Sequence, residues 1–168
     1  MNKLNVFNTQ WCPWKYPSNW PRNIRLFFRQ FKWAYQRITR GFCDFDVWDM
    51  DIYLSQLIAD EVKHLADTTH SYPGTTEFPT YESWKAYLYK ISELLHYSLG
   101  ELPNEYEEAW MKKWKNKGLD FINGPNTPEE EEITNKYLDK EMVNEKLKNE
   151  AQDKALNMLF QVYRNLWD

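Results

Sequence analysis

Apolar residues recur at intervals of three and four through most of this chain, in stretches that glycine and proline seldom interrupt. Only five glycines occur in 168 residues, and the eight prolines stand between the periodic stretches or near their first positions. Spacing of this kind places apolar side chains on one face of an α-helix, whereas a half-buried strand needs strict alternation. The pattern predicts an all-α fold, a compact bundle of four to six helices.

The first helical stretch should begin after an N-cap at Ser18 or Asn19 and stop at Gly41. Its apolar residues form one wide face. We expect most of the aromatic residues of the whole chain to lie in the core, and the alternative is that they form a surface for a partner. The members of this face are Ile24, Phe27, Phe28, Phe31, Ala34, Tyr35 and Ile38.

Four further helices are expected, over residues 44–67, 81–99, 103–117 and 128–166. Thr80 and Thr127 stand where N-caps belong. The last stretch would reach about 57 Å at 1.5 Å per residue, which exceeds the width of a compact domain of this size. It therefore either breaks near residues 139–143 or projects as a helical hairpin arm toward another subunit. In the second helix the apolar period runs through Val47, Met50, Leu54, Leu57, Ile58 and Leu65.

The length fits one domain, residues 1–168, in which residues 1–20 form an extended aromatic arm and residues 101–150 an acidic insertion or arm. Two cysteines are too few for a disulfide scaffold and indicate a reducing compartment. The sequence shows neither a leader pattern nor an apolar run of membrane-spanning length. We therefore expect a cytoplasmic protein with no membrane partner.

Charge is segregated along the chain. Residues 1–43 contain eight Lys or Arg and no acidic residue, whereas residues 44–168 contain 13 basic and 25 acidic residues. We favour neutralisation of the two parts by each other, either within one chain or between subunits of a homo-oligomer. The alternative is that the basic part faces a polyanion. Nucleic acid is the less favoured partner, because the isoelectric point of about 5.5 is low for such a protein.

An acidic cluster, Asp44, Asp46 and Asp51, surrounds the start of the second helix. Carboxylates grouped in this way could hold Mg²⁺ and serve as the catalytic groups of an all-α nucleotide pyrophosphohydrolase. The alternative, which we favour, is that Asp44 or Asp46 caps the helix and that both form ion pairs with Arg37 or Arg40. On that interpretation the chain has no cofactor and no metal site.

Other residues are candidates for contact with a partner or ligand. Zinc is not expected at His64 and His70, because they are six residues apart and no further ligand pattern follows. Basic residues of the first helix could contact phosphate groups, and nearby tryptophans could stack on bases. The candidate binding residues are Arg22, Arg25, Arg29, Trp33, Asp44, Asp46, Trp48, Asp51, His64 and His70.

The chain resembles a family of small proteins of tailed phages and prophages. The motif that carries the resemblance reads G-F-x-D-x-D-x-W-x-x-D-x-Y-L from Gly41, followed by H-x-Y-P from His70 and a terminal L-W-D. The resemblance implies a phage context and no particular chemistry.

Three functions remain open. The first, which we favour, is a non-catalytic accessory protein that binds or sequesters a host factor, either a defence component or a signalling nucleotide, in the host cytoplasm. The second is the Mg²⁺-dependent hydrolase, and the third is a virion or assembly component.

Overall fold

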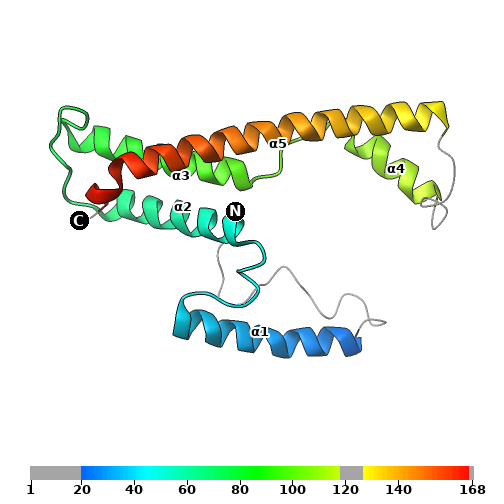
Figure 1. Ribbon diagram of the computed structural model, residues 1–168, viewed down its shortest axis with the longest axis horizontal. Coiled ribbons are helices and arrows are strands. Elements are labelled where there is room, and N and C mark those ends of the chain that lie inside the picture. The colour runs from blue at the N-terminus through cyan, green and yellow to red at the C-terminus, as the bar shows by residue number, and fades with distance from the viewer. Residues whose placement is uncertain (1–19, 118–126, 167–168) are drawn as a thin grey trace. The chain divides into compact units, whose positions relative to one another are not determined.

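The computed structural model describes residues 20–117 and 127–166, and within these ranges the chain is helical with no β-strand (Figure 1). The all-α prediction is confirmed. Residues 1–19 of the predicted N-terminal arm lie outside the described residues, and Trp20, its last predicted residue, is the first residue of α1. The helices are α1 (Trp20–Arg40), α2 (Met50–Thr68), α3 (Tyr81–Leu99), α4 (Glu107–Lys117) and α5 (Pro128–Val162), followed by a short 3₁₀ turn, η3 (Tyr163–Asn165).

The chain divides into two compact units, Met1–Glu61 and Val62–Asp168, with the boundary inside α2. The N-terminal unit contains α1, the turn that follows it and the first part of α2. The C-terminal unit contains the end of α2, α3, α4 and α5. The single domain expected from the chain length stays a prediction.

Local signals set the ends of three helices as predicted. α1 ends at Arg40, directly before the predicted stop at Gly41. The φ of Gly41 is 81°, the left-handed conformation that glycine adopts without strain, and its N–H donates to the Arg37 carbonyl at 2.9 Å. Thr80 and Ser83 form a capping box at the start of α3. Thr127 and Glu130 form another at the start of α5.

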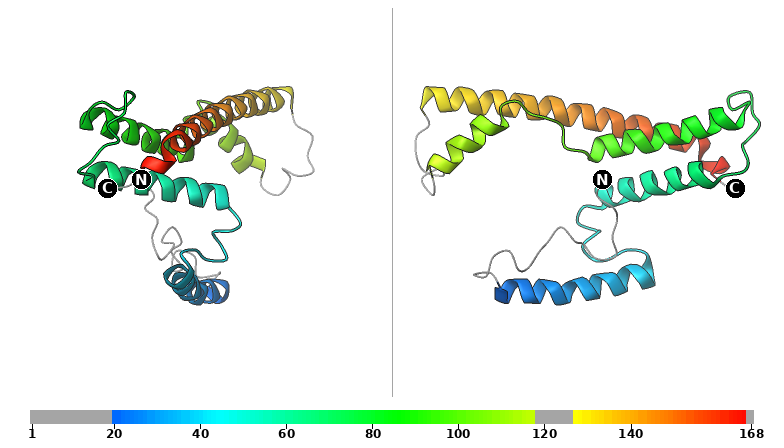
Figure 2. Two further views of the ribbon diagram at one scale, coloured as in Figure 1. Left: turned by 60° about the vertical axis from the view of Figure 1, so that its left-hand side comes forward. Right: turned by 180° about the vertical axis from the view of Figure 1, so that it is seen from behind.

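The core of the C-terminal unit lies between α3 and the C-terminal half of α5, which run antiparallel side by side (Figure 2). The predicted face of α3 is buried through Trp84, Leu88, Ile91 and Leu95, while Leu99 at its end is half-buried. The facing residues of α5 include small ones at helical spacing, which lets the large α3 side chains approach closely. The buried residues of α5 in this core are Ala151, Ala155, Leu159 and Val162.

The N-terminal half of α5 packs against α4 and forms a helical hairpin with it. The rings of Trp110 and Tyr137 are stacked with their centroids 4.4 Å apart. The Asn104 amide donates to the Tyr137 carbonyl at 3.1 Å and accepts from the Tyr106 N–H at 3.0 Å. These bonds hold the chain in a turn, so α4 begins at Glu107 and not at the predicted Pro103.

α5 is one continuous helix of 35 residues, so the predicted break near residues 139–143 is absent. Neither glycine nor proline occurs between Glu129 and Val162, and pairs such as Lys146 and Glu150, 3.9 Å apart, add support at i, i+4 spacing. The hairpin alternative is confirmed within the chain, and contact of this hairpin with another subunit stays a prediction.

The buried positions of α2 differ from the predicted face. Met50 and Leu54 are exposed, and smaller residues at the neighbouring helical positions are buried instead. The prediction relied on the large apolar side chains, whereas most of the buried residues of α2 are small. The buried positions are Ser55, Ala59, Val62 and Ala66.

Candidate interaction surface on helix α1

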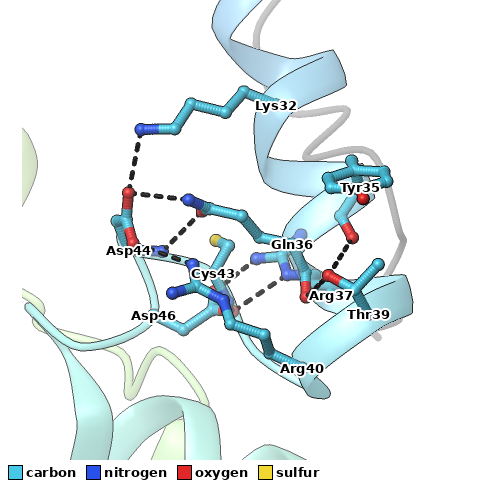
Figure 3. Close-up of polar contacts among 9 residues, drawn as sticks. All are labelled: Lys32, Tyr35, Gln36, Arg37, Thr39, Arg40, Cys43, Asp44 and Asp46. Atoms are coloured by element: carbon cyan, nitrogen blue, oxygen red, sulfur yellow. Dashed lines mark hydrogen bonds and ion pairs between the residues drawn. The ribbon is translucent and has the colours of Figure 1, made fainter.

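The chain folds back along α1 immediately after Gly41. Two successive turns bring the Asp46 N–H to the Cys43 carbonyl at 3.0 Å and the Trp48 N–H to the Phe45 carbonyl at 3.1 Å. α2 begins only at Met50, so neither Asp44 nor Asp46 caps it, and that prediction is wrong. Both carboxylates instead point toward α1, from which four polar side chains converge on them (Figure 3).

Asp46 is the buried member of this cluster. Its carboxylate forms an ion pair with the Arg37 guanidinium, whose Nε donates to Oδ2 at 3.0 Å. The same oxygen accepts the backbone N–H of Cys43 at 2.7 Å. Only 4% of the Asp46 side chain and 15% of the Arg37 side chain are exposed. A charge so far removed from water is stable because its partner and its hydrogen bonds replace the lost solvation.

Asp44 is exposed and joins three residues of α1. It accepts from Lys32 Nζ at 3.0 Å, from Gln36 Nε2 at 2.8 Å and from Arg40 at 3.0 Å. Its own N–H donates to Gln36 Oε1 at 3.0 Å. The predicted ion pairs of the two aspartates with Arg37 and Arg40 are confirmed. Part of the N-terminal positive charge is thus neutralised locally, by the first acidic residues of the chain.

The electrostatics of the cluster favour the charged forms. Hydrogen bonds from Gln36, Lys32 and Arg40 hold the pKa of Asp44 well below its usual range. Burial raises the pKa of Asp46, but the hydrogen bonds from Arg37 and from the Cys43 N–H outweigh it, and the net direction is downward. Both carboxylates therefore stay ionised at neutral pH.

Aromatic contacts complete the attachment of the turn to α1. The rings of Trp33 and Phe45 lie 5.2 Å apart, and the Arg29 guanidinium lies 5.6 Å from the Trp33 ring centroid. The Tyr53 hydroxyl donates to the Gly41 carbonyl at 2.6 Å. Trp33, predicted as a binding residue, is therefore half-buried against the turn.

On the opposite side of α1, several of the side chains that the structure describes from residue 28 onward are exposed. Four bulky residues at 3-4-3 spacing lie on one face and form what we call the α1 stripe, with exposed fractions of 66% for Phe28, 51% for Phe31, 68% for Tyr35 and 74% for Ile38. The expectation that these aromatic residues are core is wrong. Ala34, from the same predicted face, is buried, and the side chains of Ile24 and Phe27 lie outside the described residues. The turn covers the side of α1 that carries Trp33, Gln36 and Arg37, so it cannot cover the stripe.

The remaining candidate residues are not drawn into this cluster. Arg22 and Arg25 lie on α1, but their side chains are outside the described residues. Trp48 is 87% exposed, and Asp51 is exposed in the first turn of α2 with no contact to Asp44 or Asp46 among the described interactions. The two candidate histidines, His64 and His70, belong to the C-terminal unit and are exposed.

The oxygens of Asp44 and Asp46 are occupied by cationic side chains and amide groups, which does not fit the carboxylate cluster that a Mg²⁺-dependent hydrolase would need. Among the side chains that the structure describes, no group of three or more from His, Cys, Asp or Glu is placed to hold a metal ion. The expectations about cofactors stay predictions.

Sequence reasoning missed Lys32 and Gln36 as partners of Asp44 and the burial of Cys43. A signal for the first two existed, because Lys32, Gln36 and Arg40 follow each other at four-residue spacing and share a helix face. Cys43 is completely buried, and burial raises the pKa of its thiol.

The chain matches no protein-family model, and comparisons with curated proteins and with solved structures find no similar protein. The resemblance to phage proteins thus stays a prediction. None of the described helices is both long and apolar enough to cross a membrane.

Proposed function

We propose that this chain is a non-catalytic interaction protein of a phage, which acts in the host cytoplasm by binding a host component through the α1 stripe. The single observation that carries the proposal is the exposure of Tyr35 and Ile38, at 68% and 74%, on one face of α1. Soluble proteins seldom leave contiguous bulky apolar side chains in water unless the patch meets a partner.

The dimensions of the stripe support a binding role. Its four residues follow the helix for ten positions, about 15 Å, or nearly three turns. Anchors at this spacing are typical of an amphipathic helix that presents its apolar face to a partner. The neighbouring turn, held by Asp44 and Asp46, secures the C-terminal half of the helix before any partner arrives, which lowers the entropy lost on binding.

The same contacts argue against capture of a signalling nucleotide at this site. A nucleotide needs unpaired cations for its phosphate groups, whereas Lys32, Arg37 and Arg40 are all paired with aspartates. An apolar surface of a larger partner fits the stripe better than a nucleotide does. The phage context comes from the sequence resemblance alone.

Site-specific photo-crosslinking in cells tests the proposal. A benzophenone amino acid replaces Tyr35 in the stripe, or Tyr163 after α5 as the matched control, because the two side chains are 68% and 66% exposed. We expect a discrete adduct from position 35 that is absent from position 163. An adduct of twice the chain mass would show that the stripe contacts a second copy of the chain and would refute binding of a host component there. No adduct at position 35, or the same adducts at both positions, would refute the proposal.

A further inference from the structure

We propose that two copies of this chain pair through the middle of α5, with the two α5 helices antiparallel. The contact surface consists of four exposed apolar residues that we call the α5 patch. Their exposed fractions are 49% for Leu138, 63% for Met142, 53% for Val143 and 43% for Leu147. The patch belongs to the C-terminal unit and shares no residue with the α1 stripe, so this inference goes beyond the proposed function.

The α5 patch lies on the side of the helix that faces away from α4. The covered side is marked by Tyr137, whose ring stacks on Trp110, and by Asn144, whose amide donates to the Pro103 carbonyl at 3.3 Å. At 100° per residue, the middle of the patch lies roughly 160° around α5 from the middle of that covered side. The patch is therefore open to a partner while the helical hairpin stays intact.

The order of residues in the patch is nearly symmetric. Residues 138–147 read L-D-K-E-M-V-N-E-K-L, with leucine at both ends and Met142 and Val143 in the middle. Asp139 and Lys146, which have opposite charges, stand at equal distances from that midpoint. An isologous contact uses the same surface on both copies, so each residue meets its counterpart twice. A two-fold axis that crosses the midpoint at a right angle to α5 places Met142 beside Met142 and Val143 beside Val143 of the second copy.

Charge complementarity selects the antiparallel direction. Asp139 and Lys146 are seven residues apart, so they lie at nearly the same angle around α5 and about 10.5 Å apart along its axis. In an antiparallel pair, Asp139 of each copy lies level with Lys146 of the other. In a parallel pair, Asp139 would meet Asp139 and Lys146 would meet Lys146, and like charges would repel.

The contacts of these two residues within the chain leave room for the pairing. Asp139 has neither an ion pair nor a hydrogen bond among the side chains that the structure describes. Lys146 Nζ lies 3.9 Å from a Glu150 carboxylate oxygen, and the two side chains are 77% and 62% exposed. An exposed pair at this distance is weak, and an ammonium group has three donors, so Lys146 can also meet Asp139 of the second copy.

A hollow beside the patch fits the same arrangement. Leu138 and Met142 contribute its apolar lining, and unbranched methionine side chains adapt to irregular gaps. Because the two-fold axis puts Met142 of both copies on the same side of the interface, each Met142 side chain can enter the hollow of the other copy. The hollow is lined by Asn135, Leu138, Asp139, Glu141, Met142 and Glu145.

Sedimentation velocity of the full-length protein over a wide range of concentration tests the inference. Met142→Lys brings two like charges together at the two-fold axis. Phe160→Lys is the matched control, because Phe160 on α5 is 69% exposed and lies outside the patch. Asp139→Lys and the charge swap Asp139→Lys/Lys146→Asp test the direction of the pair. Circular dichroism checks that each variant retains its helical content.

We expect a concentration-dependent dimer that Phe160→Lys leaves unchanged and that Met142→Lys weakens at least about tenfold, since both copies lose a buried apolar side chain. Asp139→Lys should weaken the dimer, and the charge swap should restore it. A monomer at every concentration, or a dimer that Met142→Lys leaves intact, would overturn the inference. A charge swap that restores nothing would overturn the antiparallel pairing. The crosslink from position 35 tests a different surface, so its result decides the proposed function separately.

Discussion

Replacing Asp46 by Asn should loosen the attachment of the turn to α1 far more than the same change at Asp44. The two aspartates are two positions apart, and each meets cationic side chains of the same helix. They differ in burial, because the Asp46 side chain is 4% exposed whereas that of Asp44 is 51% exposed. The pair of substitutions therefore isolates the effect of burial on one kind of interaction.

The expected magnitude follows from the contacts of Asp46. Breaking a fully buried ion pair by removing one charge costs about 3–5 kcal/mol, because the other charge is left without compensation. Arg37 keeps some access to water, and an asparagine oxygen can still accept one hydrogen bond, so we expect about 2–3 kcal/mol for Asp46→Asn. Exposed ion pairs are largely screened by solvent, so Asp44→Asn should change stability very little.

Hydrogen exchange by mass spectrometry is the suitable assay, because the turn belongs to one of two compact units and can open without unfolding the whole chain. Amides around residues 37–53 should lose protection in Asp46→Asn, while amides of α3 and α5 keep theirs. Urea unfolding of both variants gives the corresponding global values. Equal protection of the turn in Asp46→Asn and Asp44→Asn would refute the argument that burial makes the Asp46 pair the stronger one.

Two further predictions concern pH and the core. The pKa of Asp46 is lowered in the folded state from its ordinary 3.8, so its contribution is fully present above about pH 4 and is lost as pH falls through the folded-state value. The stability difference between wild type and Asp46→Asn should accordingly stay constant from about pH 5 to 8 and shrink below about pH 4, and a difference that grows on acidification contradicts this sign. Trp84→Ala should cost about 3–5 kcal/mol in urea unfolding, because the side chain is completely buried, whereas Tyr97→Ala on the exposed side of α3 should cost much less. Equal costs would show that α3 does not pack through the Trp84 face.

Much of the helical framework could be predicted because its signals are local. Thr80, Thr127 and Gly41 mark helix ends through hydrogen bonds and backbone conformations that involve only nearby residues. The start of α4 was missed because the side chain of Asn104 is held by α5, a contact 33 residues away in sequence. Caps formed within a segment can be predicted from it, and turns fixed by distant elements cannot.

The candidate surface was harder to foresee for a different reason. Periodicity shows that Phe28, Phe31, Tyr35 and Ile38 share a face, but an apolar face that meets the core has the same pattern as one that meets a partner. The side covered by the turn is decided by Arg37 and Asp46, nine positions apart. Their ion pair was expected, although its consequence for the stripe on the other side of the helix was not.

α5 takes part in two helix pairs that share no other element, with α4 along its first half and α3 along its second. Residues 145–150 between them are mostly exposed, so the join is a stretch of plain helix. The number of residues in this stretch therefore sets the angle around the α5 axis between the side that contacts α4 and the side that contacts the Trp84 core. One residue inserted or deleted there would rotate one pair against the other by about 100° and shift it by about 1.5 Å along the axis. The length of this segment, more than its composition, is what the arrangement of the C-terminal unit depends on.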